Sequence, residues 1–304
     1  MLTRGSSSRR EEKSKIVTFH VKEEAILSDF VAKKIGSMSK TALKRVLSRG
    51  QVFVNNQVKT QYDYALRPGD VVAVDFAKEA TGLKSSRVSV LFEDDYLVVV
   101  NKSEGVLSVA TDKQEDYTAF RVVLNHLKKQ SRSNRLYVVH RLDRETSGVL
   151  IFAKQKEAQM LMQRNWQRDV KSKVYYAIVE GVVEKDEGEI RTWLNEDPKS
   201  KKVYSSDFDN GGMESITRYE VVKRLNGYTF LKVLLLTGRK NQIRVHMQSI
   251  GHPIIGDKKY GGSTSPIGRI GLHASSITFR HPITTKLMTF EAELPEKMAR
   301  FVRK

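Results

Sequence analysis

Residues 88–304 contain a succession of short apolar runs, and the length of these runs limits the folds open to the chain. Val90–Phe92 and Leu97–Val100 flank a Glu-Asp-Asp turn, and further β-branched runs follow at residues 174–179, 216–222, 228–236 and 277–279. Runs of this length and composition are typical of strands. Helical spacing occurs near residues 119–129 and 157–168. The pattern predicts a mixed α+β domain with a mainly antiparallel sheet.

A smaller αα-β unit precedes this domain. Apolar residues three and four positions apart follow Leu27 and predict one helix, and Ser39 and Gly50 bracket a second helix over Lys40–Arg49. Strand-like segments come next. The chain is therefore expected to consist of a flexible basic arm over 1–23, the small unit over 24–76, a linker over 77–87 and the strand-rich domain over 88–304.

The charge of the chain indicates a polyanionic partner. It carries 53 Lys and Arg against 35 Asp and Glu, a net charge of +18. Nucleic acid is the usual partner of such a protein, although charge alone does not distinguish DNA, RNA and an anionic membrane surface. Between Phe30 and Tyr62, seven Lys and Arg occur without one Asp or Glu. A solvated basic face is the ordinary alternative to an RNA-binding surface there.

Composition excludes several classes of chemistry. The chain has no cysteine, which removes disulfides, thiolate metal sites and cysteine nucleophiles. Its seven histidines are scattered without ligand spacing, so we expect no metal site. No apolar run reaches the roughly 18–20 residues of a membrane helix, and residues 1–15 lack the apolar core of a signal peptide. We expect a cytoplasmic protein without membrane contact, and nothing in the sequence demands more than a monomer.

Three polar segments interrupt apolar surroundings. The first places His140-Arg141-Leu142-Asp143 between two strand-like runs, where a turn can hold a side chain rigidly at the floor of a cleft. The second opens a strand with Lys173-Val174-Tyr175, and the third is the stretch 237–246, which includes Arg244. Each has an ordinary alternative. Asp143 could bond only its own turn, Tyr175 could fill a strand, and Arg244 could be one more surface cation.

Together these segments resemble the RluA-type pseudouridine synthases, which isomerise uridine in structured RNA. The resemblance covers residues 88–300, with the motifs in the right order. The motifs are His140-Arg141-Leu142-Asp143 with Thr146-Ser147-Gly148, then Lys173-x-Tyr175, then Gly238-Arg239-x-x-Gln242-Ile243-Arg244-x-His246, supported by residues 93–102, 251–257 and 272–274. One departure is Ser103, where the family usually has Pro.

The resemblance implies roles for five residues of the domain. Asp143 would act at the ribose, as a nucleophile at carbon 1 or as a base at carbon 2, with Arg244 beside its carboxylate. Tyr175 would stack on the uracil and help to remove the proton from carbon 5, and Ile243 would pack on the other side. Arg141 would occupy the position that the flipped nucleotide leaves. The reaction is an isomerisation without redox change, so it needs no cofactor or metal.

Residues 24–76 resemble a second family, the small RNA-binding fold named after ribosomal protein S-four. The matching segments are residues 27–30, 39–44, 50–55 and 68–70. Domains of this type lay their second helix on RNA phosphates. The resemblance therefore implies that RNA phosphates are bound by Lys40, Lys44, Arg45 and Arg49.

The two resemblances imply a pseudouridine synthase that acts on large-subunit ribosomal RNA, because an S-four-like unit in front is the arrangement of the ribosomal-RNA members. The same reaction on transfer RNA is one alternative. A non-catalytic RNA-binding or ribosome-assembly factor is another, and a binder would have no reason to keep Asp143, Tyr175 and Arg244 together. Nothing resembles a base-reading helix with a dimer seam, so a DNA-binding module is the weakest reading.

Overall fold

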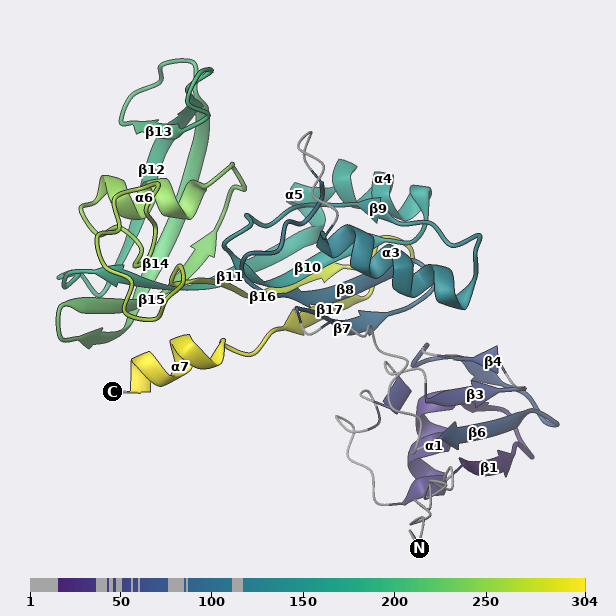
Figure 1. The fold of residues 1–304 in the computed structure, drawn as a ribbon. Helices are drawn as coiled ribbons and strands as arrows, with labels where there is room; N and C mark the ends of the chain where they lie inside the picture. The colour runs from purple at the N-terminus through teal and green to yellow at the C-terminus, as the bar shows by residue number, and fades with distance from the viewer. Residues whose placement is uncertain are drawn as a thin grey trace, which may run out of the picture. The chain divides into compact units, whose positions relative to one another are not determined.

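The computed structural model describes residues 16–36, 43, 46–47, 51–55, 57–59, 61–75, 85, 87–110 and 117–303. The chain forms two compact units, Met1–Lys84 and Ser85–Lys304 (Figure 1). The division falls inside the segment 77–87, which the sequence predicts as a linker and most of which lies outside the described residues.

The first unit combines a small antiparallel sheet with helix α1. The sheet has the order β1-β6-β3-β4, and its strands are β1 (Ile16–His20), β3 (Val52–Val54), β4 (Gln57–Val58) and β6 (Val71–Asp75). A separate pair is formed by β2 (Ala25–Ile26) and β5 (Ala65–Leu66). Helix α1 (Leu27–Ile35) buries Leu27, Phe30 and Val31 in the core. This burial confirms the helix that the spacing of these residues predicts.

Strand β1 corrects the last part of the flexible arm expected over residues 1–23, while residues 1–15 of that arm lie outside the described residues. Residues 16–20 pair with β6 along their whole length, from Ile16 opposite Asp75 to His20 opposite Val71. The strand lies at the edge of its sheet, and most of its side chains are exposed. An edge strand with little burial needs no strict alternation of apolar and polar residues, so the sequence carries only a weak signal for it.

The second predicted helix, Lys40–Arg49, lies largely outside the described residues. Leu43, Val46 and Leu47 are described and helical, and Leu43 and Leu47 are buried in the core of the first unit. The four basic residues expected to bind RNA, Lys40, Lys44, Arg45 and Arg49, are all outside the described residues.

The second unit is built on one large, mainly antiparallel sheet, which confirms the predicted fold class. The main path has the order β13-β12-β14-β15-β11-β16-β10-β8-β7, with β17 added on β16 and β9 on β10. The strands are β7 (Val88–Glu93), β8 (Leu97–Lys102), β9 (Tyr137–Val138), β10 (Ser147–Ala153), β11 (Val170–Glu180), β12 (Glu187–Glu196), β13 (Val203–Ser206), β14 (Met213–Leu225), β15 (Tyr228–Leu235), β16 (Leu272–Arg280) and β17 (Leu287–Glu291).

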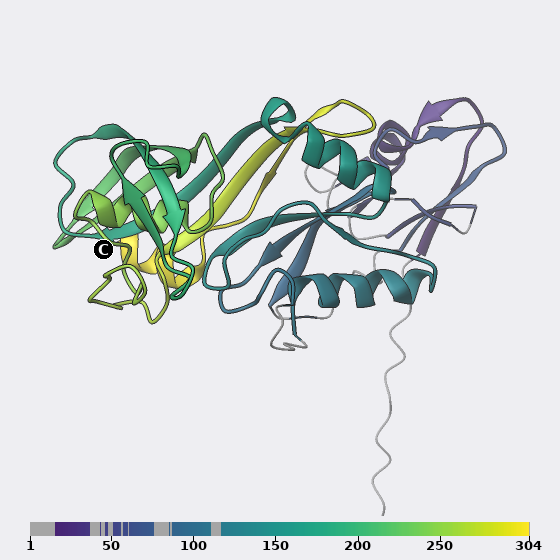
Figure 2. The ribbon, with the colours of Figure 1, turned by 90° about the horizontal axis from the view of Figure 1, so that it is seen from above.

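Helices cover both halves of this sheet. They are α3 (Ala119–Gln130), α4 (Lys156–Arg164), α5 (Trp166–Asp169), α6 (Gln242–Ser249) and α7 (Glu296–Arg303). Helices α3 and α4 lie in the half that contains β8 and β10, and α6 lies in the half that contains β12 and β14 (Figures 1 and 2). The long strands β11 and β16 join the two halves. No helix in the described segments has the length and apolar character needed to cross a membrane.

The parallel contact between β10 and β16 requires a glycine. Gly148 pairs with Ala274 and has φ of +118°, and a Cβ atom placed on it would lie 2.0 Å from the carbonyl oxygen of Ala274. Strand β10 could then pair with β16 only after the two backbones had moved apart. This contact lies five residues after Asp143, so it also fixes where the preceding loop begins and ends.

We expect Gly148→Ala to lower the free energy of unfolding by about 3 kcal/mol or more, since the strain of the left-handed region and the overlap with Ala274 both contribute. Gly227→Ala is the matched control. Gly227 has φ of +74° and open space around its Cα, so only the backbone strain of about 1 kcal/mol applies. Urea unfolding of the two variants measures the difference. Equal losses would contradict the close approach of β10 and β16.

Candidate active site

The loop that joins β9 to β10 carries Asp143. The strands that flank it pair with each other, with Val138 opposite Phe152. The buried Ser108 hydroxyl makes two hydrogen bonds with the loop. It donates to the carbonyl oxygen of Leu142 at 2.8 Å and accepts from the Leu142 amide at 3.0 Å. The sequence predicts this strand–turn–strand arrangement but not the serine that fixes it.

Lys102 is buried beneath the same loop. Its ammonium group is fully buried and donates to the carbonyl oxygens of Val106 at 2.8 Å and Arg144 at 3.3 Å. Burial lowers the pKa of Lys102 to about 7, and the negative charges of Asp143 and Glu145 oppose that shift. The sequence marks Lys102 only as part of a supporting match, although its contacts tie the Asp143 loop to β8.

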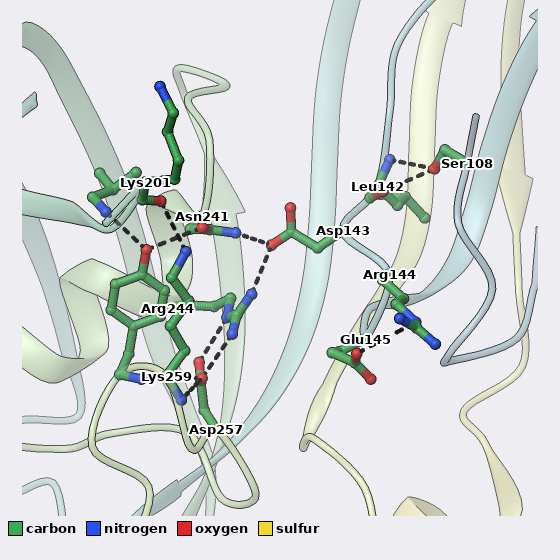
Figure 3. A network of polar contacts seen from close by, with 12 residues as sticks. Ser108, Leu142, Asp143, Arg144, Glu145, Lys201, Asn241, Arg244, Asp257 and Lys259 are labelled. Atoms are coloured by element: carbon green, nitrogen blue, oxygen red, sulfur yellow. Dashed lines mark hydrogen bonds and ion pairs between the residues drawn. The ribbon is translucent and has the colours of Figure 1, made fainter. Parts of the chain in front are cut away.

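Two donors bind one oxygen of the Asp143 carboxylate (Figure 3). The Asn241 side-chain amide donates to Oδ2 at 2.5 Å, and Nη1 of Arg244 donates to the same oxygen at 3.3 Å. The Asp143 side chain keeps 30% of its surface exposed. The carboxylate is therefore held on one side and open on the other.

Arg244 is itself held by a buried carboxylate. Its Nε and Nη2 atoms donate to the two oxygens of Asp257, each at 2.7 Å, and the Asp257 side chain is fully buried. The backbone amides of Lys259 and Tyr260 also donate to Asp257, both at 3.2 Å. A bidentate pair of this kind fixes the plane of the guanidinium, so its remaining edge points at Asp143 (Figure 3).

Gln242 fixes the start of helix α6, which carries Arg244. The Gln242 side-chain oxygen accepts from the Thr237 hydroxyl at 2.8 Å and from the Arg239 amide at 2.9 Å. Its nitrogen donates to the Thr217 hydroxyl at 2.9 Å and to the carbonyl oxygen of Ile216 at 3.0 Å. The side-chain oxygen therefore has two donors and the nitrogen two acceptors, and the helix begins at a defined point beside β14.

The other residues expected in the site line the same pocket as Asp143. Tyr175 of β11 and Ile243 of α6 contribute to the wall, together with Leu235, Leu272 and others. Burial raises the pKa of Tyr175 above its usual range, and the charge of Asp143 acts in the same direction. The phenol therefore keeps its proton at neutral pH, which favours a role as an aromatic surface over a role as a base.

Arg141 lies at the edge of this pocket. Its side chain is exposed, and it makes no hydrogen bond or ion pair with any residue that the structure describes. The four basic residues expected at RNA phosphates, Lys40, Lys44, Arg45 and Arg49, are not placed by the structure. The pocket thus brings together five of the nine residues to which the sequence assigns a role, namely Arg141, Asp143, Tyr175, Ile243 and Arg244.

Three histidines of the second unit, the half-buried His140 and the buried His246 and His273, lie outside this pocket lining. Burial lowers the pKa of His140, His246 and His273 to about 4 in each case. Nε2 of His140 accepts from the backbone amide of Ile151, and His246 contacts the hydroxyls of Thr192 and Thr217. These neutral rings are parts of the hydrogen-bonded core.

Comparison with known proteins agrees with this geometry. The model of the RNA pseudouridylate synthase family matches residues 96–249. An uncharacterized RNA pseudouridine synthase of Aquifex aeolicus is 33% identical and covers 93% of this chain and 95% of its own length. The dual-specificity RNA pseudouridine synthase RluA of Vibrio cholerae is 37% identical over 68% of this chain and 82% of its own length. Ribosomal large subunit pseudouridine synthase D of Neisseria meningitidis is 30% identical over 89% of this chain and 76% of its own length.

Proposed function

We propose that this chain, which belongs to the RNA pseudouridylate synthase family, converts uridine to pseudouridine in large-subunit ribosomal RNA, with Asp143 as the reacting carboxylate. The family makes the chain an RNA-modifying isomerase. The observation that carries the assignment of Asp143 is its carboxylate, which is bound on one oxygen by Asn241 and Arg244 and is open to the pocket on the other side.

The reaction conserves every atom of the nucleotide except for an exchange of protons. The bond between ribose carbon 1 and uracil N1 breaks, the uracil turns, and a bond forms between carbon 1 and carbon 5 of the base. Carbon 5 loses a proton and N1 gains one. In this reaction the Asp143 carboxylate can act as a nucleophile at ribose carbon 1, or as a base that removes the proton from ribose carbon 2. Both routes need one free anionic oxygen at the ribose.

The walls of the pocket suit a uracil that must turn without leaving. The aromatic ring of Tyr175 and the aliphatic side chain of Ile243 offer apolar surfaces to the base. Their enclosure keeps water from the activated ribose, where attack by water would leave an abasic site. A uridine reaches such a pocket only when it has left its stack, and the exposed Arg141 at the pocket edge is suited to replace it there.

Ribosomal RNA is the proposed substrate because two independent features favour it. One relative that covers 89% of this chain is named for the large ribosomal subunit. The first unit of the chain contains a basic, acid-free stretch, and it resembles a fold that binds structured RNA. The name of the dual-specificity relative makes transfer RNA the second candidate. We also propose that the protein acts in the cytoplasm and as a monomer, as the sequence predicts.

The substrate is tested by offering unmodified large-subunit ribosomal RNA and a transfer RNA pool to the purified protein in separate reactions. Pseudouridine is then mapped by chemical tagging and reverse-transcription stops. We expect new stops in ribosomal RNA that are absent with Asp143→Asn. Stops in transfer RNA alone would contradict the proposed substrate and retain the reaction.

The basic residues of the first unit give a separate prediction. Changing Lys40, Lys44, Arg45 and Arg49 to Ala should weaken RNA binding and flatten its salt dependence, since each phosphate contact contributes about 0.7–0.9 to the slope of log K against log salt. The measurement is RNA affinity at several salt concentrations, with circular dichroism as a check of folding. An unchanged slope would show that these four residues do not contact RNA phosphates.

A further inference from the structure

Both ends of the Asn241 side-chain amide are engaged. Its nitrogen donates to Oδ2 of Asp143 at 2.5 Å (Figure 3), and its oxygen accepts from the hydroxyl of Tyr260 at 3.0 Å. Asn241 itself is nearly buried, with 9% of its surface exposed. A flipped amide would place its oxygen against the carboxylate oxygen, so the contact with Asp143 exists in one orientation only.

Tyr260 determines that orientation. Its side chain is fully buried, and its hydroxyl oxygen accepts from the backbone amide of Val203 at 3.1 Å. The hydroxyl hydrogen is therefore free to point at Asn241. Burial raises the pKa of Tyr260, so the hydroxyl keeps the proton that it donates. The donors run in one direction, from the Val203 amide through the hydroxyl and the Asn241 amide to the carboxylate.

Tyr260 also contacts the second donor to Asp143. The guanidinium carbon of Arg244 lies 5.0 Å from the centre of the Tyr260 ring. The ring thus packs on Arg244 while the hydroxyl holds Asn241, and the two donors are kept in a fixed relation. A Phe at position 260 would keep the first contact and lose the second.

The backbone of Asn241 brings its short side chain to the carboxylate. Asn241 has φ of +53°, in the left-handed region, directly before helix α6. Among residues with a side chain, Asn enters this region with the least cost, and Gly enters it freely. If the position served the turn alone, Gly would therefore replace Asn without loss.

The consequence is that the two oxygens of Asp143 differ. Asn241 and Arg244 both bind Oδ2. Oδ1 accepts no hydrogen bond from any residue in the described part of the chain. A carboxylate held through one oxygen presents the other in a constant direction, and a displacement of about 1 Å at a reacting atom can cost about 100-fold in rate.

We propose that Asn241, oriented by Tyr260, is a positioning residue that holds Asp143 so that Oδ1 faces the ribose of the bound uridine. This inference rests on the proposed function, since it concerns the carboxylate assigned there. Asn241 has no role in the sequence-based prediction, and the two donors to Asp143 have different roles. Arg244 places a positive charge beside the Asp143 carboxylate, and Asn241 fixes the orientation of that carboxylate.

The test compares Asn241→Gly with Tyr260→Phe in single-turnover reactions at saturating protein. We expect Asn241→Gly to lower the rate constant about 100-fold and Tyr260→Phe about 10-fold, with RNA dissociation constants within about twofold of the unchanged protein. The double variant should be no slower than Asn241→Gly alone, because Tyr260 acts through the amide. Thr285→Gly is the control, since Thr285 has φ of +58° in an exposed turn and should keep its rate.

A wild-type rate in Asn241→Gly would overturn the proposal, because Gly is the best residue for the turn and lacks only the amide. Losses that multiply in the double variant would overturn it as well. If Asn241→Gly fails to fold, Tyr260→Phe is the test. A loss of rate without a loss of RNA affinity in this variant supports the proposal, and an unchanged rate overturns it. Full activity of Asp143→Asn in the same assay would instead refute the proposed function, so the two failures are distinguishable.

Discussion

Asp143→Asn is expected to lower the single-turnover rate constant for pseudouridine formation by at least about 1,000-fold, because it removes the free anionic oxygen on which both possible routes depend. RNA affinity should stay within about threefold of the wild-type value, since the amide has nearly the same shape and uniform binding is unchanged. Folding should also persist. Arg244 keeps its two 2.7 Å contacts with Asp257, so no buried cation is left without a partner.

Glu145→Gln is the matched control for this variant. Glu145 lies in the same loop, is exposed, and loses the same charge on substitution. We expect it to keep its rate constant within about twofold, as for a surface change away from the reacting atoms. Rate and RNA affinity of both variants are measured in parallel. Equal loss in the two would mean that the charge of the loop matters and that the Asp143 carboxylate has no special role.

Arg244→Met is expected to have the second largest effect, on stability and on rate together. The variant leaves the fully buried Asp257 carboxylate without its cation, and such a loss typically costs about 3–5 kcal/mol. It also removes the cation beside Asp143, which should lower the single-turnover rate constant by about 100-fold or more. Urea unfolding and single-turnover kinetics measure the two effects separately.

The double variant Arg244→Met with Asp257→Asn separates the effect of Arg244 on stability from its effect on the reaction rate. Replacing the buried carboxylate by an amide removes its unpaired charge and keeps an acceptor for the backbone amides of Lys259 and Tyr260. We therefore expect part of the stability to return while the rate stays low. Recovery of both would show that Arg244 acts only through the fold.

Much of the fold could be predicted because its signals are local. The spacing of Leu27, Phe30 and Val31 specifies α1, and the apolar runs specify the main strands. Strand β1 could not be predicted in this way, because its pairing with β6 joins residues 51 to 59 positions apart and buries few of its side chains. Tertiary pairing of an edge strand adds information that the local sequence does not contain.

Those residues of the candidate site that belong to recognisable motifs could be predicted. Residues whose role depends on backbone conformation and hydrogen-bond direction could not. Asp143 and Arg244 lie 101 positions apart, and only the family resemblance brought them together before the structure did. Asn241 occupies an unspecified position of its motif. Its contact with Asp143 depends on a backbone φ of +53° and on the hydroxyl of Tyr260. Backbone dihedrals and the direction of a hydrogen bond leave no periodic pattern in a sequence.

Isomerisation of uridine by means of Asp143 can be followed at the hydrogen on carbon 5 of the base, which leaves as pseudouridine forms. The most direct measurement uses RNA with tritium at carbon 5 of uridine, and counts released tritium and pseudouridine in the same reaction. We expect one tritium to be released for each pseudouridine formed, no free uracil, and neither product with Asp143→Asn. Free uracil or tritium without pseudouridine, or undiminished product with the variant, would contradict it.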